Sequence, residues 1–331
     1  MSMQIQFRDK LRKFLSRNDL VIERIFKGIM AFVCFMVINA NFGYSSVLNS
    51  LWLPLVVAVL CAFVPGSALS LVVIVYWLIH LASLQTDIAL VAAILFGVAY
   101  AFTTIYQGSI YYNVIGIPLA YPIRIPYVFP VQSALLGKSS EVITVICGSV
   151  IAYYLKSVKE HAAQIIDSQS NVSVSDILMD GMLSNTMFYV FLTAMVAAFL
   201  VTYVLRCSTI SNAWLLGSLA GVSVEFIILL AGYLILNRGS QIPFLIIGNL
   251  VTLASAYVSS YLFFDLDYTR TEKVQFEDDD YYYYVTAVPK VKIEKEAKEI
   301  KKITEGNPSA RNAKMNFSEE KKDRKEVTEV E

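Results

Sequence analysis

The sequence predicts an all-α fold: a polytopic transmembrane helix bundle of about eight spans, with a broken Pro-rich re-entrant element and a short cytoplasmic tail. Of the 331 residues, 56% are hydrophobic and 16% are charged, and the charges gather towards the two ends. Soluble domains carry about 25% charged residues, so this composition is typical of a membrane protein. The net charge of zero averages a basic N-terminus, a nearly neutral middle and a mixed-charge tail.

Residues 1–25 predict an amphipathic basic helix on the membrane surface. Ile5, Phe7 and Leu11 fall on one helical face, and Lys and Arg residues crowd the remainder, as in helices that lie on anionic lipid. A soluble basic leader is the alternative. In either case the Lys/Arg excess before the first span predicts a cytoplasmic N-terminus.

The spans follow from apolar runs of roughly 20 residues, the length that crosses a bilayer. We expect them at about 26–43, 47–64, 66–84, 87–106, 130–156, 184–206, 213–237 and 243–264. Eight spans return the chain to the cytoplasm, which suits the Lys-rich tail and Arg206, whereas Lys156 and Lys159 would then lie outside. The predicted location is the cytoplasmic (plasma) membrane, with both termini in the cytoplasm.

Residues 107–129 form the Pro-rich element, in which prolines recur every four residues, up to the first residue of the next span, with Arg124 among them. These prolines are Pro118, Pro122, Pro126 and Pro130. Each removes a backbone donor and disfavours a regular helix. Irregular backbone persists in a membrane only where protein buries it or where it lines a wet cavity. We therefore expect a re-entrant element on the cytoplasmic half, since a ninth span would put the tail on the wrong side.

Four charged residues are candidates for a solute or ion site. Glu225 lies near the centre of a span, with Gly217 and Gly221 on its helical face. An ionisable group there indicates function by default. A substrate, proton or cation site is one interpretation, and a structural pair with Arg124 or Lys138 is the other.

The remaining candidates have equally open interpretations. Glu141 stands one turn from Lys138, and a local ion pair between them would account for both residues. Arg124 faces an anionic substrate, lines a pore, or marks the membrane surface at a loop tip. Tyr121 and Tyr127 are expected in an aromatic belt at the membrane interface, together with Tyr106, Tyr111 and Tyr112.

Two segments share the spacing G-x-S-x-E-(x6)-G, at residues 137–148 and 221–232. Transporters often contain repeats that bring matching polar groups to the midplane. Both spans run in the same direction in the predicted topology, so the repeat would be parallel. Chance similarity among small residues is the alternative.

The residues support no enzyme, cofactor or metal site. The only histidines are His80 and His161, and HExxH is absent, so a metalloprotease would lack ligands. No GxxxxGK[ST] motif cradles a phosphate. The four cysteines form no CxxC pair and are expected to be small apolar residues. Nothing beyond the lysines of the tail favours nucleic acid.

The tail changes character after residue 265. Residues 265–305 predict one or two strands followed by an amphipathic helix, and residues 306–331 predict a disordered charged segment. Four tyrosines in the strand region are candidates for docking a cytoplasmic protein: Tyr281, Tyr282, Tyr283 and Tyr284.

The segments IPYVFPVQSALLG, from residue 125, and FEDDDYYYYVTAVPKV, from residue 276, resemble an uncharacterised family of multi-pass membrane proteins from Gram-positive anaerobes. That family has no assigned activity, so the resemblance implies a bacterial cytoplasmic membrane and no mechanism.

Three classes of function follow. The first is a permease-like protein that moves a small solute or ion through a polar site near the bilayer midplane, built on Glu225 with Arg124 and Glu141. The alternative is a non-transporting scaffold or assembly subunit whose tail recruits a partner protein. An intramembrane enzyme is the third class, and it lacks a catalytic set.

Overall fold

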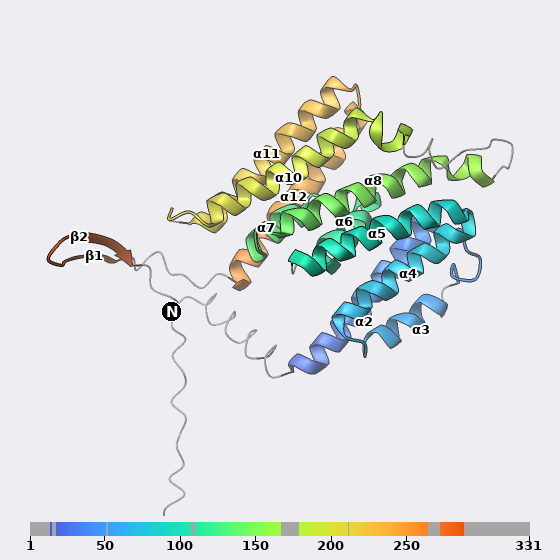
Figure 1. The fold of residues 1–331 in the computed structure, drawn as a ribbon, viewed down its shortest axis with the longest axis horizontal. Coiled ribbons are helices and arrows are strands. Elements are labelled where there is room, and N and C mark those ends of the chain that lie inside the picture. The colour runs from blue at the N-terminus through green and yellow to red at the C-terminus, as the bar shows by residue number, and fades with distance from the viewer. Residues whose placement is uncertain are drawn as a thin grey trace, which may run out of the picture. The chain divides into compact units, whose positions relative to one another are not determined.

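The computed structural model describes residues 14, 18–50, 52–106, 110–166, 179–210, 212–263 and 272–287, and helices form most of this part of the chain (Figure 1). The elements before residue 137 are α2 (Asp19–Phe42), α3 (Trp52–Cys61), α4 (Gly66–Leu84), α5 (Thr86–Tyr106), η1 (Ile110–Ile115), α6 (Gly116–Ile123) and α7 (Val128–Leu136). The elements after it are α8 (Glu141–Ile166), η2 (Met179–Leu183), α10 (Thr186–Arg206), α11 (Ala213–Ile235), η3 (Gly239–Gln241), α12 (Ile242–Phe263), β1 (Glu272–Glu277) and β2 (Tyr282–Ala287).

The helices form two groups with a third between them. Helices α2 to α5 make one group, α10 to α12 make another, and α6, α7 and α8 lie between the two (Figure 1). Helix α8 touches both groups, since it packs on α5 and on α10. Large side chains such as Trp77, Tyr153 and Phe191 are fully buried in the core.

Five of the described helices are long and apolar enough to cross a membrane: α5, α8, α10, α11 and the segment Gly239–Phe263. This confirms the all-α, membrane-type bundle in outline. Two shorter apolar helices accompany them, and α3 has 10 residues where a span at 47–64 was predicted. Helix α2 begins at Asp19, so residues 19–25 of the predicted surface helix continue into the first predicted span.

The predicted span at 130–156 is wrong as a single helix. Helix α7 ends at Leu136, and α8 begins at Glu141 after a turn. The Arg206 guanidinium caps the end of α7, because its Nη1 lies 2.7–3.0 Å from the carbonyl oxygens of Ala134, Leu135 and Gly137 and so satisfies carbonyls that the helix leaves free. Helix α8 then continues to Ile166, ten residues beyond the predicted end.

The Pro-rich element is more regular than its sequence predicts. Pro118 and Pro122 both lie inside α6, and the chain leaves helical geometry at Arg124. It then folds back, so that the ring of Phe129 in α7 lies against Gly116 at the start of α6 and packs at a tilt on the Tyr112 ring, with centroids 5.1 Å apart. Helices α6 and α7 therefore form a helical hairpin with its tip at Arg124.

The two G-x-S-x-E-(x6)-G segments do not share a structure. Gly221, Glu225 and Gly232 lie within one continuous helix, α11. Gly137 lies instead in the turn before α8, and Glu141 is the first residue of that helix. The shared spacing is therefore not a structural repeat.

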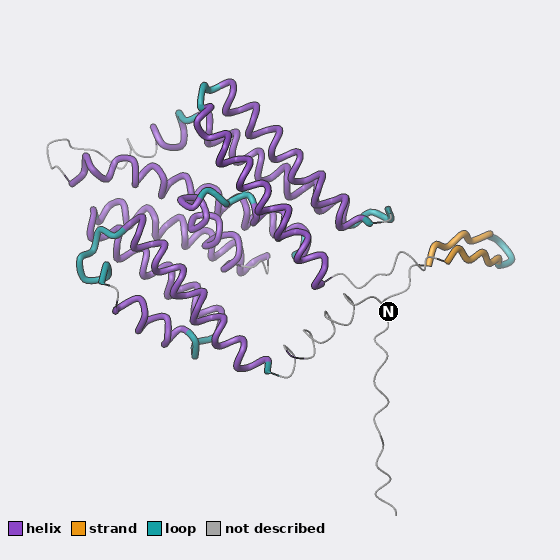
Figure 2. The backbone as a smooth tube through the Cα atoms, turned by 180° about the vertical axis from the view of Figure 1, so that it is seen from behind, coloured by secondary structure: helices purple, strands orange, loops and turns teal. Residues whose placement is uncertain are grey.

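Strands β1 and β2 pair as an antiparallel hairpin, with Phe276 opposite Tyr283 (Figure 2). This confirms strand structure in the tyrosine-rich segment. The expected tail helix and the charged segment from 306 lie outside the described residues, as do residues 1–13 and 15–17 of the surface helix.

Candidate functional site

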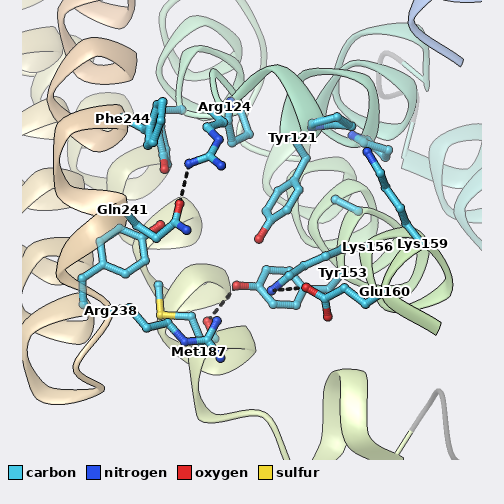
Figure 3. A pocket seen from close by; sticks show the side chains of 16 residues that line it. Tyr121, Arg124, Tyr153, Lys156, Lys159, Glu160, Met187, Arg238, Gln241 and Phe244 are labelled. Carbon is cyan, nitrogen blue, oxygen red and sulfur yellow. Dashed lines mark hydrogen bonds and ion pairs between the residues drawn. The ribbon is translucent and has the colours of Figure 1, made fainter. Parts of the chain in front are cut away.

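A cavity of about 440 Å³ lies among the middle and last helices, lined by parts of α6, α8, α10, α11, η3 and α12 (Figure 3). We call it the Arg124 pocket. Its wall is rich in cations and tyrosines: Arg124, Lys156, Lys159 and Arg238, with Tyr121, Tyr127, Tyr153 and Tyr233. Glu160 is the one carboxylate among the lining residues.

Helix-ending turns place both arginines at the pocket. At the end of α6, Arg124 is left-handed (φ 68°), and Ile125 N–H donates to the Ala120 carbonyl at 3.1 Å. At the end of α11, Asn237 is left-handed (φ 53°), and Arg238 N–H donates to the Tyr233 carbonyl at 2.8 Å. Both turns have the six-to-one bond of a Schellman motif. Glycine usually occupies the left-handed position, because a side chain there costs about 1–2 kcal/mol.

The Arg124 side chain is fixed by two contacts with the start of the last helix. Its Nη1 donates to Gln241 Oε1 at 2.7 Å. The guanidinium carbon also lies 3.7 Å from the centroid of the Phe244 ring, which is a cation–π arrangement. Arg124 therefore ties the tip of the α6–α7 hairpin to the α11–α12 connection.

Helix α8 supplies the opposite wall through Lys156, Lys159 and Glu160, which share one helical side. Lys156 Nζ lies 4.8 Å from the centroid of the Tyr153 ring and 3.8 Å from Glu160 Oε1. Lys159 Nζ donates to Asn41 Oδ1 at 2.7 Å. The Glu160 carboxylate thus lies near only one of the pocket cations at ion-pair distance.

Tyrosines form the inner wall. Tyr121 and Tyr153 pack with ring centroids 5.4 Å apart, and the Tyr153 hydroxyl donates to the Met187 carbonyl at 3.1 Å. Tyr127 is 5% exposed, and Tyr233 lines the same pocket. The expected interfacial belt is therefore wrong for Tyr121 and Tyr127, because the fold-back at Arg124 turns both rings into the bundle.

The pocket has an excess of positive charge, with four cations and one carboxylate. Within the described part of the chain, Arg124, Lys159 and Arg238 have no carboxylate within 4 Å. Three of the four cations are therefore without a counter-ion, which is the arrangement of a site for an anionic group.

Glu225 lies outside this wall. It is 0% exposed in α11, and neither carboxylate oxygen has a hydrogen-bond partner among the described residues. The structural pair with Arg124 or Lys138 is therefore not formed. Tyr127, which lines the pocket, lies within electrostatic range of Glu225.

Glu141 and Lys138 lie away from the Arg124 pocket. Lys138 is exposed in the α7–α8 turn, whereas Glu141 is buried and accepts a hydrogen bond from Asn113 Nδ2 at 3.4 Å. Glu141 begins α8 and Lys156 follows 15 residues later, which is about 22 Å along a helix. The four predicted site residues therefore do not form one site.

Most pocket residues were missed by sequence reasoning. Lys156 and Lys159 were interpreted as topology signals, and Tyr153, Arg238 and Gln241 were not singled out. One local signal for these residues was available on α8. Lys156 and Glu160 stand four residues apart directly after an apolar stretch, which is the spacing of an ion pair on one helical face.

Comparison with known proteins yields no match to a family model, a curated protein or a solved structure. The function is therefore inferred from the geometry of this chain, and the resemblance noted in the sequence stays a prediction.

Proposed function

We propose that this chain is a permease-like membrane protein and that the Arg124 pocket is its solute site. The supporting observation is a 440 Å³ cavity, lined by cations and tyrosines, within a bundle of apolar helices. Its volume lies in the usual range for small-molecule sites. Four of its five charged side chains (Arg124, Lys159, Glu160 and Arg238) are exposed and Lys156 is half-buried, so a charged solute can reach them from outside the bundle.

The α6–α7 hairpin fits this proposal as the re-entrant element of an eight-span chain. Transporters bind solutes where helices are interrupted, because the broken backbone supplies polar groups at membrane depth. The interruption at Arg124 lies at the pocket wall. With a cytoplasmic N-terminus, α8 runs outwards, so its pocket-lining half faces the exterior. The hairpin tip at Arg124, which lines the same pocket, then extends beyond the cytoplasmic half in which the sequence predicts it.

Glu225 has the role of a proton-binding group in this proposal. A buried carboxylate with no hydrogen bond costs several kcal/mol, so the group favours its neutral acid form until the surroundings change. Opening of the pocket past Tyr127 would admit water and allow the proton to leave.

The test is uptake by the purified full chain in liposomes, with a panel of anionic, neutral and cationic small solutes and an imposed pH gradient. Glu225→Gln keeps the shape of the side chain and removes the titratable group. We expect it to fold and to lose proton-coupled uptake, whereas Glu277→Gln, on exposed β1, should transport normally. If no solute crosses faster than in protein-free liposomes, the permease proposal is wrong. If Glu225→Gln only lowers stability, Glu225 is structural.

A scaffold role is the second candidate, and the β1–β2 hairpin supports it. Strand β1 is exposed along its whole length, and Tyr284 is 80% exposed. An isolated two-stranded hairpin is marginally stable in water, so a partner surface would stabilise it. Crosslinking and mass spectrometry on the full chain and on a chain cut after residue 271 would test this: a stoichiometric partner lost with the tail favours the scaffold, and purification of both forms alone contradicts it.

A further inference from the structure

We propose that the Arg124 pocket binds a phosphate monoester, with the phosphate among Arg124, Arg238 and Lys156 and the organic part against the tyrosine rings. This inference rests on the proposed solute site and names the class of its ligand. The carrying observation is the geometry of the cations around one shared space.

Figure 3 shows these cations reaching the space from three separate parts of the chain. Arg124 comes from the hairpin tip, Arg238 from the turn after α11, and Lys156 from α8. Arg124 uses one nitrogen on Gln241, which leaves the rest of its planar fork for a ligand. The Arg238 guanidinium has no hydrogen-bond partner within the described residues. The free guanidinium of Arg238 and the partly free guanidinium of Arg124 suit the several oxygens of a phosphate.

The charge balance favours a dianion. Four cations and one carboxylate leave an excess of three positive charges. A phosphate monoester carries about −1.5 to −2 at neutral pH, so it offsets most of this excess. A carboxylate offsets one charge, and a neutral solute offsets none.

The size and the apolar surfaces indicate an organic group beside the phosphate. The cavity of about 440 Å³ lies in the range that holds a small organic ligand. The rings of Tyr121 and Tyr153, with Pro118 and Pro122, provide an apolar surface for such a group. A soluble phosphate ester and the monoester headgroup of a lipid such as phosphatidic acid share this chemistry.

The experiment measures binding to the full chain in detergent by calorimetry. The probes are glycerol 3-phosphate, neutral glycerol, the carboxylate glycerate and short-chain phosphatidic acid. We expect binding of at least one phosphate monoester, no binding of glycerol, and weaker binding of glycerate. Binding of glycerol 3-phosphate identifies a soluble ligand, and binding of phosphatidic acid alone identifies a lipid headgroup.

The variant Arg238→Gln removes one fork from an exposed turn, so folding should not depend on it. We expect it to weaken phosphate binding at least about 10-fold, the usual effect of losing a charged hydrogen bond. Lys273→Gln, on exposed β1, removes the same charge elsewhere and should bind as the wild type does. Equal binding of glycerol and glycerol 3-phosphate, tighter binding of glycerate, or undiminished binding by Arg238→Gln would overturn the proposal.

The two proposals fail separately. Phosphate binding without uptake into liposomes would leave the ligand class standing and refute the permease. Uptake of a neutral solute that Arg238→Gln leaves unchanged would support the permease and refute the phosphate monoester.

Discussion

Arg124 allows the backbone strain of the hairpin tip to be separated from the function of its side chain. Its backbone is left-handed, at φ 68° and ψ 29°, where a side chain costs about 1–2 kcal/mol. Arg124→Ala and Arg124→Gly both remove the guanidinium, the bond to Gln241 and the contact with Phe244. These losses cancel when the two variants are compared with each other.

The remaining difference between the variants is the backbone. Glycine relieves the left-handed strain, and it loses about 0.5–1 kcal/mol more than alanine to the entropy of the unfolded chain. We therefore expect Arg124→Gly to be more stable than Arg124→Ala by about 0.5–1 kcal/mol. Both variants should bind glycerol 3-phosphate at least about 10-fold more weakly than the wild type.

Denaturant unfolding of the detergent-solubilised full chain measures the stability difference, and calorimetry measures binding. Arg124→Lys, which keeps the charge without the planar fork, should retain part of the affinity. If Arg124→Ala is as stable as Arg124→Gly, the left-handed strain is not stored at this residue. If Arg124→Gly binds as tightly as the wild type, the side chain does not contact the ligand.

Three further predictions concern the stability of the helix bundle and of the β1–β2 hairpin. A Cβ on Gly221 would overlap the Thr202 hydroxyl of the facing helix α10, so Gly221→Ala should lower the free energy of unfolding by about 1–3 kcal/mol. Gly97→Ala, with no neighbouring atom within 4 Å, should be close to neutral. Arg206→Gln removes the guanidinium that caps α7 and should lower the free energy of unfolding by at least about 2 kcal/mol in the same measurement. Wild-type stability of this variant would contradict a stabilising cap by Arg206. The Tyr283 hydroxyl donates to Asp278 at 2.8 Å and holds the pKa of that carboxyl below its ordinary value. The hydrogen bond therefore stabilises the β1–β2 hairpin fully at pH values above the pKa that Asp278 has in the unfolded chain. This stabilisation is lost as the pH falls through the lower pKa that Asp278 has in the folded chain. Amide exchange in β1 and β2 should show this acid loosening, and it should be absent in Asp278→Asn.

The sequence predicts the helices whose evidence is local, and it fails where distant residues decide the structure. Runs of apolar residues were enough to place α5, α10 and α11 within a few residues of their observed bounds. The break between α7 and α8 coincides with a local signal, the polar run GKSSE at residues 137–141, which was interpreted as charges within one span. The partner that satisfies the last carbonyls of α7 is Arg206, about 70 residues later in the chain, and no local pattern indicates that contact.

The candidate site shows the same division. Arg124 was recognised because a charge among prolines is unusual within a short stretch of sequence. Its companions come from α8 and from the turn at Arg238, and no local pattern links these segments. Tyr127 illustrates the limit well, since a tyrosine near a loop is typical of the membrane interface, and the fold-back of the hairpin instead buries it.

The buried position of Glu225, without hydrogen-bond partners and near the pocket, fits a group whose surroundings change better than a fixed structural group. A buried acid without hydrogen bonds adds nothing to stability that an apolar side chain of similar volume would not supply, and the described contacts of Glu225 include no structural partner. In the proposed permease, a shift of Tyr127 would let water or a ligand from the pocket reach this group. Tyr127 also packs on Gly248 of α12, beside the backbone of Arg124. In the proposed permease, a ligand that draws Arg124 away from Gln241 would disturb the packing of Tyr127 on Gly248, and this disturbance would couple ligand binding at the cations to proton release at Glu225.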